Sequence, residues 1–372
     1  MANKWLKLFP AAKRSKADVL IDGEEYFLAI IAAIETAKTP HDYIYILGWM
    51  LDISFELSPG KTLFTLLEKA AKSGVEIRIL IWDNFDPNYL KLNADAVRKL
   101  STLPGPVNLS VFLDGHTFST AKSKKFVLEV VSKGITLLNA LQKTFFVVDS
   151  EVKRDLAGLV TKLTPFLSSP TIGTHHEKVV IVKSKNVLTA FCGGIDFNKN
   201  RVISEIKGKE YRFPYYHDTA CRLQGPAAYE VLQKFKMRWR NHPQAKSVIL
   251  LGEKEPQPKD CPSPSPYAKV VGTYNSPNGS EPPVRSLKHA YVKIIDNAKS
   301  YIYIEDQYMV NLEVASALKK KVQDENFKMV TFAIQAESET QDILIPLRKR
   351  IKFLLGFMDG MTSAQQAKVC VA

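Results

Sequence analysis

The residues best suited to chemistry lie in the segment THHEKVVIV, residues 174–182. Its apolar second half predicts a buried strand. Because side chains alternate along a strand, His176 and Lys178 share one face while Glu177 points the other way. A neutral imidazole can attack phosphorus, and a neighbouring ammonium can stabilise the negative charge that develops on the phosphate oxygens. The pair therefore predicts a phosphate site, although a three-letter pattern also recurs by chance.

Two further segments follow this pair along the chain. The segment VLTAFCGGIDFN predicts a strand that ends in a glycine pair, Gly193 and Gly194, where the backbone can approach a ligand closely. His217 and Asp218 then begin a stretch that leads into a helix with a proline at its start. A structural role is the alternative interpretation of His217.

The elements that must position these residues alternate along the chain. Apolar periodicity predicts helices over 24–37 and 61–72 and strands over 43–47, 75–82 and 107–113. This order is typical of a largely parallel or mixed sheet with helices on its faces. A further segment, residues 121–168, predicts an inserted helical block.

A proline-rich stretch and an internal repeat predict two lobes. Residues 256–283 contain eight of the twenty prolines, which favours an irregular connection. Beyond it, residues 291–304 repeat the helix, the Ala-Lys pair and the Tyr-Ile-Tyr-Ile pattern of residues 31–46. We interpret this as an internal duplication. The predicted domains are a first lobe over 1–250 with the helical insert at about 115–170, a linker over 251–285, and the start of a second lobe over 286–372.

Composition excludes several classes of protein. The longest apolar run has eight residues, far short of the roughly 20 that a membrane-spanning helix needs. Four cysteines without a CxxC pair indicate neither a zinc site nor a disulfide framework. The first twenty residues lack an apolar signal core, so we expect a chain that is cytoplasmic or exported without a signal peptide. The formal net charge of +13 suits a phosphate-bearing partner, and equally an ordinary solvated surface.

The chain resembles the phospholipase D superfamily in four motifs that occur in order. They are HHEKVVIV (175–182), GGIDF (193–197), HDTACRLQGPAAYEVLQKFKMRWR (217–240) and IYIEDQY (302–308), and the resemblance spans roughly residues 20–335. It implies an α/β, phospholipase D-like fold, in which a mixed sheet is flanked by helices and two lobes are related by internal duplication, the second lobe being incomplete.

The resemblance also implies roles for individual residues. His176 is expected to be the catalytic histidine and Lys178 a phosphate-binding lysine. The predicted substrate-binding residues are those of the glycine turn and the HD motif, namely Gly193, Gly194, Asp196, His217 and Asp218. No metal and no cofactor are expected.

Two departures from the family signature H-x-K-x4-D stand out. The position of the signature Asp holds Lys183, and Asp196 could serve in its place. In addition, His176 is the only histidine of the chain with a lysine two positions on, so a second HxK is missing. We therefore expect this chain to supply half of an active site, completed by a complementary C-terminal half or by a second chain.

The expected function is that of a metal-independent phosphodiesterase with a phosphohistidine intermediate. The motifs look more like the phospholipid-cleaving bacterial branch, including lipase effectors delivered by contact-dependent (type VI) secretion, than like the small nucleases. A phospholipid substrate is therefore expected in preference to nucleic acid. Two alternatives stay open: a nuclease of the same superfamily, which the charge favours, and a truncated, inactive phosphate- or lipid-binding remnant, which the missing HxK favours. Residues 343–358 combine apolar and basic side chains, which suits either an anionic membrane surface or a solvated helix.

Overall fold

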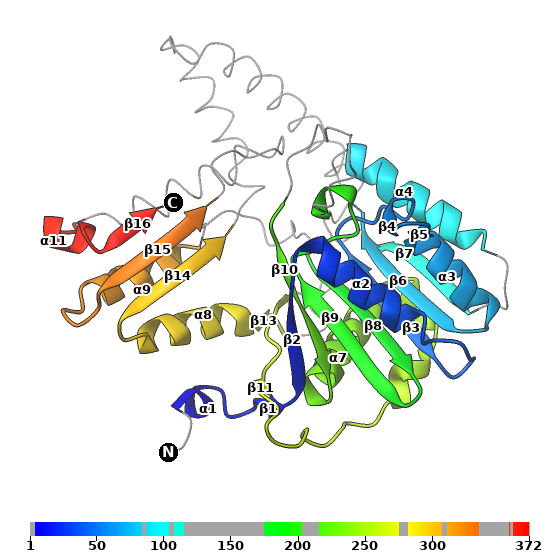
Figure 1. Ribbon diagram of the computed structural model, residues 1–372, viewed down its shortest axis with the longest axis horizontal. Helices are drawn as coiled ribbons and strands as arrows, with labels where there is room; N and C mark the ends of the chain where they lie inside the picture. Colours follow the sequence, from blue (N-terminus) through cyan, green and yellow to red (C-terminus); the bar gives the residue numbers. More distant parts are fainter. Residues whose placement is uncertain are drawn as a thin grey trace, which may run out of the picture. The chain divides into compact units, whose positions relative to one another are not determined.

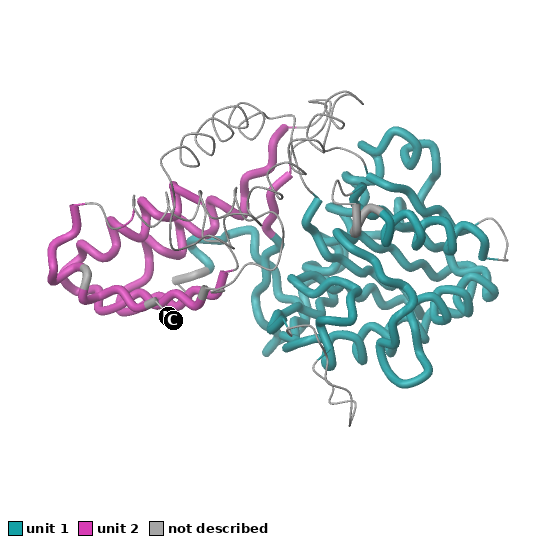
Figure 2. The backbone as a smooth tube through the Cα atoms, turned by 90° about the horizontal axis from the view of Figure 1, so that it is seen from above, with its two compact units in different colours: residues 1–124, 170–270 teal, residues 125–169, 271–372 magenta. Residues whose placement is uncertain are grey.

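The structure, a computed structural model, forms two compact units. One comprises residues 1–124 and 170–270, and the other comprises residues 125–169 and 271–372 (Figure 2). The described residues are 4–83, 87–103, 108–114, 175–202, 216–274, 282–306, 311–334, 357 and 360–371. The predicted helical block over 121–168, and most of the basic amphipathic stretch over 343–358, lie outside these residues.

A seven-stranded mixed sheet forms the centre of the first unit, with the strand order β2-β10-β9-β8-β3-β6-β7 (Figure 1). Strands β3, β6 and β7 run parallel, whereas β8, β9, β10 and β2 pair antiparallel. The strands are β2 (Lys16–Ile21), β3 (Tyr43–Gly48), β6 (Glu76–Trp82), β7 (Leu109–Asp114), β8 (Lys178–Ser184), β9 (Val187–Gly193) and β10 (Thr219–Gln224). Every residue of β3 and β6 is buried, as expected for central strands covered on both faces.

Helices cover both faces of this sheet. On one face, α2 (Asp22–Ile34), α3 (Leu63–Lys72) and α4 (Pro87–Ser101) pack on the isoleucines of β3 and β6 and on Val180 and Val182 of β8. On the other face lies α7 (Pro226–Asn241), where Tyr43, Tyr45 and Phe235 form a stack with ring centroids 4.5 and 4.7 Å apart. The expected class, a mixed α/β sheet flanked by helices, is confirmed, and α2, α3 and α7 lie within a few residues of the helices predicted there.

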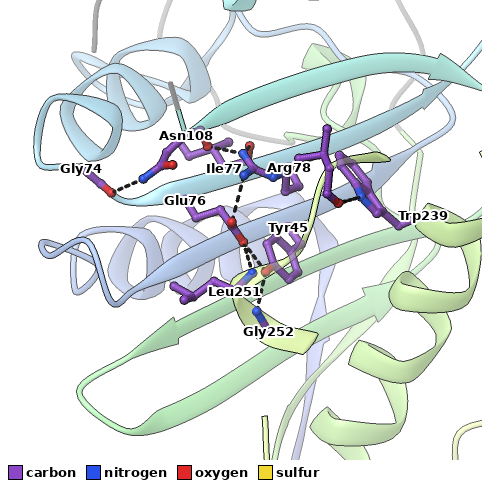
Figure 3. A network of polar contacts seen from close by, with 10 residues as sticks. Tyr45, Gly74, Glu76, Ile77, Arg78, Asn108, Trp239, Leu251 and Gly252 are labelled. Carbon is purple, nitrogen blue, oxygen red and sulfur yellow. Dashed lines mark hydrogen bonds and ion pairs between the residues drawn. The ribbon is translucent and has the colours of Figure 1, made fainter. Parts of the chain in front are cut away.

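The chain after α7 returns along the first unit. It passes through short 3-10 helices at Ala245–Ser247 (η2) and Leu251–Lys254 (η3), and then β11 (Tyr267–Ala268) pairs with β1 (Lys13–Arg14). Figure 3 shows how it is held: the amide of Leu251 donates to Glu76 Oε1 over 2.8 Å, and the amide of Gly252 donates to the Tyr45 hydroxyl over 2.8 Å. Residues 251–270, part of the predicted linker, thus pack with the first unit.

The second unit has a three-stranded parallel sheet, β14-β15-β16. Its core contains Ile295, Leu318, Phe327, Phe332 and Phe357. The helix and the strand that the internal repeat predicts over residues 291–304 are present here, and a second helix and strand follow them. The elements are β12 (Thr273–Tyr274), β13 (Val284–Arg285), α8 (Ser286–Asn297), β14 (Tyr301–Asp306), α9 (Leu312–Val322), β15 (Met329–Ile334), α11 (Ser363–Gln366) and β16 (Val369–Val371).

Within the part of the chain that the structure describes, no helix is both long and apolar enough to cross a membrane. The remaining short elements of the first unit are α1 (Lys4–Leu8), β4 (Glu56–Ser58), β5 (Lys61–Thr62) and the 3-10 helix η1 (Lys199–Arg201).

Candidate active site

The candidate site residues gather at one edge of the seven-stranded sheet. The pairing of Leu47 with Val179 places the carboxyl end of β3 beside the start of β8. Lys178, Gly193 and Ala220 then lie in one row across β8, β9 and β10. This is also the edge at which the parallel strands β6 and β7 end. Open α/β sheets commonly bind ligands at the carboxyl ends of their parallel strands.

Lys178 and Asp196 form a buried ion pair at this edge. The Lys178 Nζ lies 2.9 Å from Asp196 Oδ2, and the two side chains expose only 4% and 1% of their surface. Burial lowers the pKa of Lys178, whereas the Asp196 carboxylate raises it. The second oxygen of Asp196 accepts a 3.3 Å hydrogen bond from the Met50 amide, just beyond β3. Asp196, considered above as a substitute for the signature Asp, thus stabilises the charged form of the lysine.

His176 lies two residues before β8 and is exposed to solvent. Its ring meets the Trp49 ring edge to face, with centroids 5.2 Å apart, and Lys178 Nζ lies 5.3 Å from the Trp49 centroid. The surrounding chain excludes water from part of the imidazole, and Lys178 and Arg201 add positive charge nearby; together they lower the pKa of His176 to about 3. The imidazole is therefore neutral at pH 7, the form that can act as a nucleophile.

Trp49 is a site residue that the sequence analysis missed. It follows β3 directly, and its ring stacks on Trp82 at 5.9 Å. The amide of Asn93, a fully buried side chain of α4, donates to the carbonyls of both tryptophans at 3.0 and 2.9 Å. The sequence offered one signal for Trp49 as a site residue: both tryptophans stand at the end of a strongly apolar strand.

Glu177 points away from His176 and Lys178, as the alternation along the strand predicts. It accepts a 2.9 Å hydrogen bond from Arg238 of α7, and the same guanidinium lies 3.2 Å from Asp114 at the end of β7. The other neighbour, His175, has its Nδ1 2.7 Å from Asp114. The two residues that flank His176 are therefore held on the opposite side of the chain.

Glycine is required at positions 193 and 194 because other atoms of the protein lie where a Cβ atom would be. A Cβ atom on Gly193 would lie 2.4 Å from the Cα of Ala220, and one on Gly194 would lie 2.0 Å from a carboxylate oxygen of Asp218. The space that the missing side chains leave is filled by β10 and by Asp218 itself. Contact of Gly193 and Gly194 with substrate stays a prediction.

His217 and Asp218 lie at the start of β10 beside the first turn of α2. The Nδ1 of His217 is 2.8 Å from Asp22 Oδ1, and 57% of the His217 side chain is exposed. Asp218 lies 3.1 Å from Arg201. Burial raises the pKa of Asp218, opposed by the charges of Arg201 and Lys178. Asp218 thus belongs to the charged group around Lys178, while His217 is anchored to Asp22 with much of its ring in solvent.

Lys183, which stands where the family signature has Asp, forms an ion pair with Glu255, the residue that follows η3. Lys183 lies five residues after Lys178 and therefore on the opposite side of β8. The replacement is thus accommodated by a carboxylate from the segment that returns after α7. Among the residues that the structure describes, no group of three or more histidine, cysteine or acidic side chains is arranged to hold a metal ion.

Comparison with curated proteins finds relatives along most of the chain. Phospholipase D alpha 3 of Arabidopsis thaliana is 22% identical, over 92% of this chain and 47% of the plant protein. Phospholipase D A of Dictyostelium discoideum is 24% identical, over 82% of this chain and 22% of its own length. The major cardiolipin synthase ClsA of Bacillus subtilis (strain 168) is 25% identical, over 80% and 46%. The chain spans about half or less of the length of these relatives, and no family model matches.

Solved structures with similarity include Nuc from Salmonella typhimurium, a phospholipase D family member, with 15% identity and a TM-score of 0.31 over 61% of this chain and 95% of Nuc. Polyphosphate kinase from Porphyromonas gingivalis gives a TM-score of 0.45 with 10% identity, over 96% of this chain and 40% of the kinase. The sheet edge with its His-x-Lys pair defines a candidate phosphate-handling site on an α/β scaffold. Over most of its length the chain is similar in sequence to members of the phospholipase D superfamily.

Proposed function

We propose that this chain is a phosphodiesterase of the phospholipase D type, with His176 as the nucleophile. The observation that carries the proposal is the solvent-exposed His176 imidazole, which shares the Trp49 ring with a buried lysine paired to Asp196. Names of relatives add support, since they include phospholipases D and a cardiolipin synthase.

In the proposed reaction, a ring nitrogen of His176 attacks the phosphorus of a phosphodiester. A phosphorus–nitrogen bond forms as the bond to the leaving alkoxide breaks, and an acid delivers a proton to that alkoxide. Water then attacks the phosphohistidine, loses a proton to the conjugate base of that acid, and releases the imidazole. The Lys178 ammonium donates to a non-bridging oxygen, where negative charge grows in the transition state.

The acid must come from a second group, because His176 is occupied as the nucleophile. His176 is the only histidine of this sequence in an HxK pattern. The proposal therefore includes a complementary C-terminal half or a second chain that carries the other half of the site. A phospholipid at a membrane surface is the proposed substrate, and export by a contact-dependent secretion system is the proposed route for a bacterial effector of this type.

A nuclease of the same superfamily is the second candidate, and the net charge of +13 favours it. Hydrolysis of phosphatidylethanolamine vesicles and nicking of supercoiled plasmid, both measured in EDTA, separate the two. Each assay is run on wild type and His176→Ala, alone and with the candidate second half.

We expect phosphatidate release that His176→Ala abolishes, with a phosphohistidine trapped by an alkaline quench. Hydrolysis that persists in His176→Ala contradicts the mechanism. Plasmid nicking without lipid hydrolysis favours the nuclease. Vesicle binding with no turnover under any condition indicates an inactive, lipid-binding remnant.

A further inference from the structure

The charged cluster on the far side of the His176 segment has a geometry that the proposed chemistry does not use. It consists of Asp114, His175, Glu177 and Arg238. The side chains of Asp114 and Arg238 expose 1% and 5% of their surface, and His175 exposes 12%. Buried ionic groups of this kind are stable only when their hydrogen-bonding geometry is good.

Arg238 is the centre of the cluster. Its two terminal nitrogens go to different carboxylates: one donates to Glu177 Oε2 over 2.9 Å, and the other donates to Asp114 Oδ2 over 3.2 Å. The planar guanidinium presents two donors in a fixed geometry, which an ammonium cannot do. One side chain of α7 therefore connects the end of β7 to the segment that enters β8.

The cluster holds both sequence neighbours of His176. Glu177 is held directly by Arg238, and His175 is held through Asp114, 2.7 Å from its Nδ1. Burial and the charge of Arg238 lower the pKa of His175, so the ring is neutral and can donate from Nδ1 to the carboxylate. Residues 175–177 precede the first hydrogen-bonded residue of β8, so the sheet ladder alone does not fix them.

We propose that Arg238 is a positioning residue for His176. By holding Glu177 and the Asp114–His175 pair on one side of the chain, it directs the His176 ring to the other side, against Trp49 and beside Lys178. The inference rests on the proposed function only in naming His176 the nucleophile. The predicted placement of the ring is independent of turnover.

The test measures the surroundings of His176 by NMR in the full chain, labelled with ¹³C-histidine. The His176 resonance is assigned from its disappearance in His176→Gln. Burial, together with the charges of Lys178 and Arg201, lowers the pKa of the His176 ring to about 3. The Trp49 ring, 5.2 Å away between centroids, sets its ring-current shift. Arg238→Met and Glu177→Met break the cluster, because methionine has neither the guanidinium donors nor a carboxylate oxygen that accepts from them. Arg238→Lys keeps the charge but loses the two-pronged bridge.

The matched control is Arg240→Met. Arg240 lies two residues further along α7 and forms an ion pair with Glu253 with 58% of its side chain exposed. We expect wild type and the control to keep the His176 ring unprotonated down to about pH 4. In Arg238→Met and Glu177→Met the ring should protonate at higher pH, toward the 6.5 of a free imidazole, and lose its ring-current shift. Arg238→Lys should give an intermediate result.

An unchanged His176 resonance in folded Glu177→Met and Arg238→Met overturns the proposal. An equal change in Arg240→Met also overturns it, because the effect is then not specific to the cluster. If Arg238→Met does not fold, Glu177→Met decides, since the side chain at this position is 35% exposed and methionine keeps its length. Failure of the proposed function has a different signature: no phosphohistidine forms in the wild type although the His176 resonance responds as described.

Discussion

Replacing Asp196 with asparagine tests the buried pair that stabilises the charge of Lys178. Two unit charges 2.9 Å apart attract each other by about 6 kcal/mol at an effective dielectric constant of 20. Part of this attraction offsets the cost of burying both groups. Removing one partner of such a pair typically costs about 3–5 kcal/mol, because the other charge stays buried without compensation. We expect Asp196→Asn to lower the free energy of unfolding of the first unit by that amount.

The loss should depend on pH in a defined direction. Burial lowers the pKa of Lys178 from its ordinary 10.5, and Asp196 opposes this, so Asp196→Asn lowers it further. At a pH between the folded and the unfolded pKa of Lys178, the unfolded chain keeps a proton on this residue that the folded chain has lost. In that range the free energy of unfolding rises with pH. The variant should therefore regain stability as pH rises through the folded pKa of Lys178 toward 10.5.

Urea denaturation followed by tryptophan fluorescence measures this stability, because all four tryptophans of the chain lie within residues 1–270 and report on the first unit. Asp18→Asn is the matched control. Asp18 pairs with Arg222 at 3.0 Å, with the side chains 54% and 43% exposed, and such surface pairs contribute less than about 1 kcal/mol. Adding Lys178→Met to Asp196→Asn should restore part of the loss, with a coupling of about 2 kcal/mol. Equal losses in Asp196→Asn and Asp18→Asn, or additive effects in the double variant, would refute the reasoning.

Three further outcomes are expected. In the proposed phosphodiesterase reaction, Lys178→Ala should lower kcat per folded molecule by about 10²–10³; a loss below tenfold would show that Lys178 does not stabilise the transition state. Gly193→Ala should cost about 1–3 kcal/mol or more in thermal unfolding, because its Cβ would lie 2.4 Å from the neighbouring strand, whereas Gly272→Ala meets nothing within 4 Å and should be close to neutral. Burial and the adjacent Cys221 raise the pKa of the Cys192 thiol to about 11, so iodoacetamide at pH 8 should alkylate the exposed Cys370 first. Equal alkylation rates by peptide mass spectrometry would contradict this.

The local geometry of the candidate site was predictable from the sequence. Alternation along residues 174–182 sufficed to place His176 and Lys178 on one side and Glu177 on the other, because the period of a strand depends only on its backbone. The helix periodicities likewise predicted α2, α3 and α7, and with the order of strands they predicted the fold class.

The partners of these residues were not predictable in the same way. Trp49, Asn93 and Arg238 reach the site through the strand order and through helix packing, which depend on contacts between residues far apart in the sequence. The glycine pair illustrates the limit. Two consecutive glycines indicated that some group lies very close to the backbone here. Only the pairing of β9 with β10 shows that this group is Ala220 beside Gly193 and Asp218 beside Gly194.

The position of β8 in the sheet has a consequence for how the first unit folds. The central strand β3 is flanked by β6, which follows soon after it, and by β8, which begins only after residues 115–177 have been passed (Figure 1). During synthesis, β3 therefore leaves the ribosome long before its antiparallel partner exists. Pairing two strands so far apart in the sequence slows folding, and an unpaired apolar edge promotes aggregation meanwhile. Refolding from urea should accordingly be slow and depend on protein concentration, and fragments that end before Ser184 should be insoluble.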